Sequence, residues 1–352
     1  MNIGMMAAWN TDSGVAVHAE PLGKAWVEMG HELTVFSFIK DDFHGNGFTG
    51  EDEDYVIRCL GTKKTNFLDP RPILTRHFDV FVIQDLLMLP TESLAAIFPI
   101  LKKRSLVFHV VHENIIPEDV QFYQFDWDGV IYFCDRQDFL QDVYPNARLI
   151  PFPCFPRRRK NKQEARKNLG LPPDKKIIYL FCQRGYQPFC RDLPEELKED
   201  TVLLVIIPSG EEFLEEKNPP PWMIVRREKP LSHERFDDYL FAADAVIMHK
   251  YRSRNHAVVS STVYQALGAG CPILVPGDSD FFYPFDQEVI RYQDAEDLRN
   301  ILVKIIAGDG KYLNTMMEVD KFVNENSPER IAEEHLQYFE DIKKGNSNVN
   351  RS

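Results

Sequence analysis

The sequence predicts an α/β protein built from two domains, each with a parallel sheet covered by helices on both faces. The chain has 352 residues, of which 44% are apolar, so it can form two cores of ordinary size. Apolar segments of strand length alternate with helix-length segments in both halves, which is typical of a parallel sheet with crossover helices. Prolines and a basic run near residue 155 interrupt this alternation and mark a domain boundary.

The first half shows helical spacing most clearly at residues 15–29, where apolar side chains recur every three or four positions. Gly30 is a natural end for this helix, and Pro21 should kink the helix or mark its first turn. Further helices are expected at 91–101 and 135–144. Strand-like runs lie at 2–8, 33–38, 80–84, 106–111, 129–133 and 148–151. We therefore expect a first domain over residues 1–155.

The second half restarts the same alternation and predicts a second domain over residues 156–327. Its strand-like runs lie at 177–181, 202–207, 224–226, 245–248 and 272–275. Helices are expected at 232–242 with Ser232 as the N-cap, at 262–269 with Gly270 as the stop, and at 295–307. Residues 328–344 read as one long helix, and the polar tail 345–352 is expected to be disordered.

Charge and composition favour a cytoplasmic protein that does not bind nucleic acid. The formal net charge is −13, which repels phosphate backbones. The six cysteines lack metal-finger spacing and are expected to be reduced thiols. We expect neither a signal peptide nor a membrane span, because no apolar run approaches the ~18 residues that a span requires. The basic run 157–160 fits a solvated linker, with phosphate binding or peripheral contact with an anionic membrane as alternatives.

Two places in the first half carry residues suited to ligand binding. The loop after the first strand contains Ser13 and Gly14, directly before a helix whose free N–H groups can attract phosphate or sugar hydroxyls. His112 and Glu113 follow the strand-like run 106–111. Ligands of open α/β sheets bind beyond the carboxyl ends of the strands, so His112 and Glu113 are placed where a ligand would lie.

Cations and hydroxyl groups gather at two places in the second half. Arg184 and Arg191 follow its first strand, where arginine can hold phosphate oxygens. Three cations precede a helix that begins near residue 260, and three hydroxyl residues lie at its start, suited to capping the helix and to donating to phosphate. These residues are Lys250, Arg252, Arg254, Ser260, Ser261 and Thr262.

These blocks, in this order over nearly the whole chain, resemble the GT-B fold glycosyltransferases, specifically the large retaining family 4 type. The resemblance implies two Rossmann-like domains facing each other across a cleft. It also implies transfer of a sugar, as in a hexosyltransferase, from a nucleotide-diphosphate sugar to an acceptor of unknown kind, with retention and no metal or other cofactor. The resemblance implies that His112, with help from Glu113, faces the donor sugar and hydrogen-bonds one of its hydroxyls. It also implies that Arg184, with Arg191 as the nearest second cation, contacts the diphosphate.

The sequence departs from the family where two glutamates with seven residues between them are usual. Gln265 takes the later position, and Ala257 or its neighbour His256 stands at the earlier one. Gln265 can still hydrogen-bond a ribose, but loss of the earlier carboxylate leaves transfer itself open. A non-catalytic nucleotide-sugar-binding or partner protein, and a sugar-nucleotide epimerase on the same fold, remain alternatives.

Overall fold

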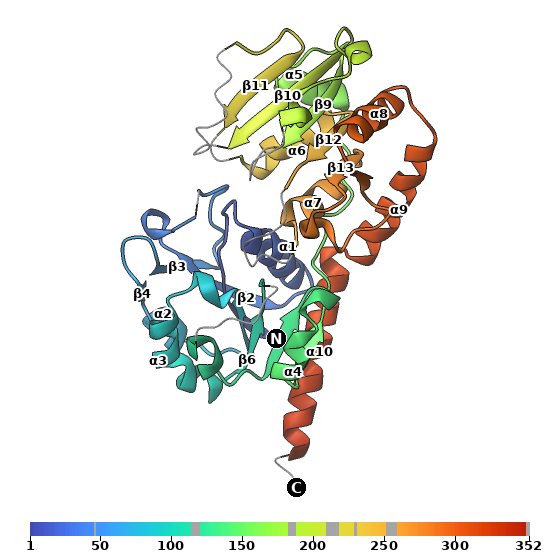
Figure 1. The fold of residues 1–352 in the computed structure, drawn as a ribbon. Coiled ribbons are helices and arrows are strands. Elements are labelled where there is room, and N and C mark those ends of the chain that lie inside the picture. Colours follow the sequence, from blue (N-terminus) through green and yellow to red (C-terminus); the bar gives the residue numbers. More distant parts are fainter. Residues whose placement is uncertain are drawn as a thin grey trace. The chain divides into compact units, whose positions relative to one another are not determined.

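A computed structural model of the chain describes residues 1–45, 47–113, 120–181, 188–208, 218–228, 231–250 and 259–349. The chain divides into two compact units, which are drawn in Figure 1. Unit 1 holds Met1–Pro153 and the residues from Asn326 onward, and unit 2 holds most of the chain between Cys154 and Glu325. The division lies two residues before the boundary that the sequence predicts.

Unit 1 contains an eight-stranded sheet in the order β4-β3-β2-β1-β5-β6-β7-β8. Neighbouring strands are parallel except for β4, which pairs antiparallel with β3 at one edge. The strands are β1 (Asn2–Met6), β2 (Glu32–Phe38), β3 (Val56–Gly61), β4 (Phe67–Leu68), β5 (Val80–Gln84), β6 (Leu106–Val110), β7 (Gly129–Tyr132) and β8 (Ala147–Leu149). Residues of β1, β5 and β6 are almost all buried, because helices cover both faces of a parallel sheet.

The helices of unit 1 include the long helix expected after the first strand. They are α1 (Gly14–Glu28), α2 (Arg71–Leu74), α3 (Thr91–Lys102), α4 (Phe139–Val143) and α10 (Pro328–Val349), with short 3₁₀ turns η1 (Lys40–Asp42), η2 (Leu86–Met88), η3 (Val120–Gln124) and η4 (Asp135–Gln137). Helix α1 begins because the Ser13 hydroxyl accepts the amide of Ala16 at 3.1 Å. It continues through Pro21 and ends before Gly30, whose φ of +85° suits glycine.

Unit 2 contains a six-stranded parallel sheet in the order β11-β10-β9-β12-β13-β14. Its strands are β9 (Lys176–Phe181), β10 (Thr201–Pro208), β11 (Met223–Glu228), β12 (Ala245–Met248), β13 (Ile273–Pro276) and β14 (Ile290–Tyr292). Its helices are α5 (Lys162–Asn168), α6 (His233–Ala242), α7 (Ser261–Leu267), α8 (Ala295–Ile306) and α9 (Lys311–Glu325), with 3₁₀ turns η5 (Pro188–Arg191), η6 (Glu195–Leu197) and η8 (Asp280–Phe282). Ser232 caps α6 as expected, since its hydroxyl accepts the amide of Arg235 at 3.2 Å.

The basic run 157–160 is largely paired inside unit 2. Arg157 contacts Asp320 at 2.7 Å, Arg158 contacts Asp237 at 2.7 Å, and Lys160 pairs with Asp238. These ion pairs hold the run against α6 and α9, so it is more than the solvated linker that the sequence predicts. The five cysteines among the described residues are buried and form no disulfide with one another.

The C-terminal helix differs from its expected length and packs on the first helix of unit 1. Helix α10 reaches Val349, so the prediction of a disordered tail is wrong for residues 345–349. Trp26 of α1 donates its indole N–H to the carbonyl of Ala332 at 3.3 Å, and its ring lies 5.9 Å from that of Phe339. None of the helices that the structure describes combines the length and apolar character needed to cross a bilayer.

Truncating Trp26 should therefore destabilise unit 1 by releasing α10. We expect Trp26→Ala to cost about 3–5 kcal/mol, because the indole is fully buried and also bonds the helix backbone. The measurement is chemical denaturation, together with the rate at which protease cuts within α10. Trp222→Ala, at a half-buried indole of unit 2, is the control and should leave protease cutting of α10 unchanged. Equal protection of α10 in wild type and Trp26→Ala would contradict this account.

Candidate functional site

The strand order of each sheet indicates where a ligand binds. In unit 1 the chain builds outward from β1 in one direction and then, after β4, in the other direction from β5. In unit 2 the same reversal separates β9 from β12. Ligands of open α/β sheets bind beyond the carboxyl ends of the strands at such a switch point. Each unit therefore has one candidate half-site, and the two are described separately.

The loop after β1 is held in an unusual backbone conformation. Asn10 has a φ of +52°, a left-handed value that costs free energy in a residue other than glycine. Its amide donates to the buried carboxylate of Glu20 at 2.8 Å, and its side-chain amide donates to the carbonyl of Glu51 at 2.8 Å. Arg58 donates to the carbonyl of Trp9 at 3.0 Å. These bonds hold the loop in the shape that presents the start of α1.

Ser13 and Gly14 lie where the sequence predicts a ligand-binding helix start. Gly14 is exposed and is the first residue of α1. Ser13 is half-buried, and its hydroxyl caps the helix and lies 2.9 Å from that of Thr11. The Ser13 hydroxyl is therefore already used by the protein, whereas Gly14 is exposed and has no side chain to keep a ligand from its backbone.

The ends of β5 and β6 bring several polar side chains together. Nε2 of His112 lies 3.1 Å from Oε1 of Gln84, so the proton sits on Nε2 when Gln84 accepts. Asp85 follows Gln84 with a φ of +53°, and its carboxylate accepts the amide of Leu87 at 3.2 Å. Asp85 and Asn10 are the two non-glycine residues with positive φ among the described residues, and they follow β5 and β1, the strands on either side of the switch point. Backbone strain of this kind is concentrated at functional sites.

Burial determines the charge of the two residues that the sequence proposes as catalytic. Desolvation, aided by nearby His109, lowers the pKa of His112 to about 3, so its imidazole is neutral at pH 7. Glu113 is 4% exposed, and burial, followed by the charge of Asp85, raises the pKa of its carboxyl well above its usual value. His112 can thus act as a neutral hydrogen-bonding group, and Glu113 can hold a proton.

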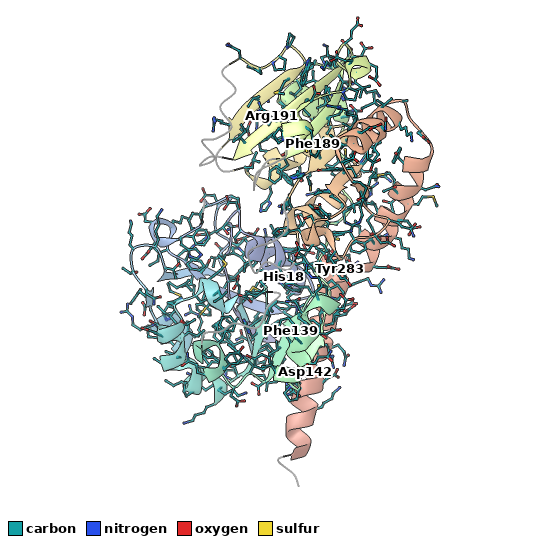
Figure 2. The ribbon with its side chains drawn as sticks, viewed as in Figure 1. His18, Phe139, Asp142, Phe189, Arg191 and Tyr283 are labelled. Atoms are coloured by element: carbon teal, nitrogen blue, oxygen red, sulfur yellow. The ribbon has the colours of Figure 1, made fainter. Side chains whose placement is uncertain are left out.

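His18 is a further member of this region that the sequence analysis misses. It lies on α1 and is labelled in Figure 2. Its ring is fully buried, with its centroid 5.4 Å from that of His112 and 6.0 Å from that of His335 on α10. Burial, with the nearby rings of His112 and His335, holds its pKa well below the usual range. The sequence shows only a histidine beside apolar positions of a predicted helix, and the same pattern fits a histidine that is simply buried in the core.

The half-site of unit 2 centres on Lys250, which follows β12 at the switch point. Lys250 is 6% exposed, and its ammonium donates to the hydroxyl of Ser260 at 2.9 Å and lies 5.4 Å from the ring centroid of Phe281. Ser260 is the N-cap residue of α7 by position, but its hydroxyl makes no capping bond. The expectation that Ser260 caps α7 is wrong, because its oxygen accepts from Lys250 instead.

The remaining predicted residues of unit 2 take varied positions. Ser261 and Thr262 form the first turn of α7, with Ser261 half-buried and Thr262 buried. Arg191, labelled in Figure 2, ends η5 with its guanidinium 3.9 Å from the sulfur of Met223. The amide nitrogen of Gln265 lies 3.2 Å from Nδ1 of His233. Predictions for Arg184, Arg252, Arg254 and His256 fall outside the described residues.

The structure thus gathers His112, Glu113, Gln84 and Asp85 at one switch point, and Lys250 with Ser260 at the other. Sequence reasoning named His112, Glu113, Lys250 and Ser260 but not Asp85, although its place directly after an apolar strand was visible. The described residues contain no group of three or more His, Cys, Asp or Glu side chains that could hold a metal ion.

Comparison with known proteins shows which fold this is. No family model matches the sequence. A glycosyltransferase from Rickettsia africae superposes with a TM-score of 0.69 at 11% identity, covering 97% of this chain and 98% of that one. Sucrose-phosphate synthase from Thermosynechococcus elongatus gives 0.64 at 15% identity over 98% and 100% of the two chains.

A third similar structure was solved with a ligand bound. It is Anabaena HepE in complex with UDP-glucose, with a TM-score of 0.65 at 11% identity over 99% of this chain and 100% of that one. These similarities span almost the whole chain. They agree with its two α/β sheets, in both of which the chain adds strands first on one side of a central strand and then on the other. The chain therefore has the GT-B fold of these proteins, as the sequence pattern predicts.

Proposed function

We propose that this chain is a glycosyltransferase that moves a sugar from a nucleotide-diphosphate sugar to an acceptor. The observation that carries the proposal is the buried ammonium of Lys250 at the switch point of unit 2. A fixed cation just beyond the carboxyl end of a central strand, beside the start of α7, is suited to contact the phosphates of a nucleotide ligand. HepE, which shares the fold, is described in complex with UDP-glucose, and this supports a nucleotide sugar as the ligand.

The proposed sugar transfer requires little covalent chemistry from the protein's side chains. As the bond to the sugar breaks, negative charge develops on the diphosphate, and a fixed cation stabilises it. Lys250 supplies that charge, and the hydroxyls of Ser261 and Thr262 supply donors at the start of α7. Arg184, Arg191, Arg252 and Arg254 remain predicted contacts of the same diphosphate. Retention of configuration rests on the sequence resemblance.

Unit 1 contributes uncharged hydrogen-bonding groups to the proposed site. His112 carries no charge at pH 7, so it orients sugar hydroxyls by hydrogen bonding rather than by charge. The exposed Gly14 at the start of α1 gives a ligand access to helix N–H groups.

One observation favours a second candidate, a nucleotide-sugar-binding protein without activity. Gln265 and the residues near 257 replace the two glutamates of similar enzymes, and the amide of Gln265 already contacts His233. A thermal-shift screen of UDP, GDP and ADP sugars, followed by a turnover assay with the stabilising ligand, separates the two. Stabilisation with release of the nucleoside diphosphate supports the transferase, and stabilisation without turnover supports the binding protein.

Replacing Lys250 should weaken nucleotide binding. We expect Lys250→Met to raise the Kd of the stabilising nucleoside diphosphate by at least about tenfold, because a charge-assisted contact to phosphate is lost. Isothermal titration calorimetry gives the Kd. Lys176→Met removes a half-exposed cation at the opposite end of β9 and should leave it unchanged. Equal affinity in wild type and Lys250→Met would remove Lys250 from the site.

Replacing His112 should affect transfer more than binding. We expect His112→Ala to lower kcat about 100-fold and the Kd of the nucleotide less than threefold, since His112 belongs to unit 1. The pH–rate profile of the wild type should show no inflection from His112 between pH 5 and 9, because its pKa is about 3. His77→Ala, at an exposed position, is the control. Full activity in His112→Ala would make its role structural.

A further inference from the structure

We propose that unit 2 carries a second ligand site, separate from the proposed nucleotide-sugar site, that binds neutral sugars. The site is a cavity of about 510 Å³ lined by the edge strand β14 and by the helices α8 and α9, which are labelled in Figure 1. Its volume falls within the range of roughly 300–1,000 Å³ that is typical of small-molecule sites. Strand β14 lies two positions from β12 in the sheet, and the residues that line the cavity are not those of the half-site around Lys250.

The cavity has an apolar floor and an exposed rim. Ile290 of β14, Ile301 of α8 and Tyr312 of α9 line it, and all three are buried members of the apolar core of unit 2. The core packing fixes the floor, because interiors of this kind are close-packed. Among the other lining residues, Gln287 and Asn314 are exposed, so a ligand can enter from solvent.

Arg291 of β14 brings a fixed hydrogen-bond donor to the cavity. Its Nη2 donates to the carbonyl of Phe282 at 2.8 Å and to that of Phe285 at 2.7 Å, which sets the orientation of the guanidinium. Within the described residues, the other N–H groups of this half-buried guanidinium form no hydrogen bond. A donor that is already oriented loses little conformational entropy when it bonds a ligand.

Four charged side chains line the cavity, and their charges cancel. Arg291 and Lys304 are cations, and Asp297 and Glu318 are carboxylates. In the part of the chain that the structure describes, none of the four forms an ion pair. Each therefore keeps hydrogen-bonding capacity for a ligand, although one oxygen of Asp297 accepts the amide of Gln293 at 3.0 Å.

The two signs are spread over the walls of the cavity. Helix α8 carries Asp297 and Lys304 on one face, and the seven residues between them correspond to about 10 Å along the axis. Arg291 comes from β14 and Glu318 from α9, so no wall has a single sign. A phosphate would meet a carboxylate as well as a cation, and an amino acid, whose opposite charges are adjacent, would find no matching pair on one wall.

A neutral sugar fits this lining. A sugar hydroxyl both donates and accepts, so it can bond Arg291 and Lys304 as an acceptor and Asp297 and Glu318 as a donor. The exposed side-chain amides at the rim supply donors and acceptors of both kinds. The apolar floor, which includes the ring of Tyr312, suits the C–H face of a sugar ring.

Saturation-transfer NMR on the full chain tests the ligand class. The neutral probes are maltose, cellobiose, lactose and N-acetylglucosamine, and the charged probes are glucose 6-phosphate and glutamate. We expect a neutral sugar of this panel to bind more tightly than both charged probes. Binding by none of the neutral sugars, or tighter binding of glucose 6-phosphate or glutamate, would overturn the proposal.

Variants of the lining then test the place of binding. For the neutral sugar that binds, we expect an affinity at least about fivefold lower in Lys304→Met/Glu318→Gln and in Asn314→Trp, because hydrogen bonds are lost in the first and the mouth is blocked in the second. Glu296→Gln/Lys321→Met, at exposed positions of the same two helices that do not line the cavity, is the matched control and should bind as the wild type does. Thermal melting checks that each variant folds. Unchanged affinity in both cavity variants would overturn the site.

Two further measurements separate this site from the proposed nucleotide-sugar site. The neutral sugar should bind Lys250→Met and His112→Ala as it binds the wild type, and a loss of binding in these variants but not in the cavity variants would overturn the second site. Hydrogen exchange of the wild type should slow in α8 and α9 when the sugar is added, and no slowing there would also overturn it. None of these outcomes depends on whether the chain binds a nucleotide or transfers a sugar.

Discussion

Parallel pairing at two central junctions, β1 with β5 and β9 with β12, is the constraint on which the rest of the structure depends. At each junction the chain reverses the direction in which it adds strands, so the segments that follow the two strands diverge. Helices cover both faces of each sheet, which leaves the carboxyl edge as the place where polar side chains can meet a ligand. Asn10 and Asp85 adopt strained backbone conformations at one such edge.

Desolvation then gives the two half-sites opposite electrostatic character. Around β5 and β6, burial disfavours charge: it lowers the pKa of His18 and His112, so their imidazoles are neutral at pH 7, and it raises the pKa of Glu113 well above its usual value. After β12, burial instead surrounds an ammonium with a hydroxyl and an aromatic face. A donor that carries a diphosphate suits the second environment, and an uncharged polyol suits the first. The division of labour proposed here follows from these two environments.

One of the two helices beside the half-sites lacks the capping bond that its sequence predicts. Ser260 occupies the N-cap position of α7 but gives its oxygen to Lys250. Ser13, in the equivalent place before α1, makes the ordinary capping bond. The difference arises because a buried ammonium competes for the hydroxyl of Ser260, and an ammonium forms a stronger hydrogen bond than a backbone amide does.

The sequence by itself determined the α/β class, most of the strands and long helices, and the places of His112 and Lys250, because hydrophobic periodicity and strand ends are local signals. It did not reveal β3, β4, β14, α5 or α9, whose segments are short or lack a strong apolar period. Only the tertiary structure decided that His112 meets Gln84, that Lys250 donates to the hydroxyl of Ser260, and that the basic run 157–160 pairs with aspartates. Each of these contacts joins residues from separate segments, and burial, which sets their charge, exists only once the chain is folded.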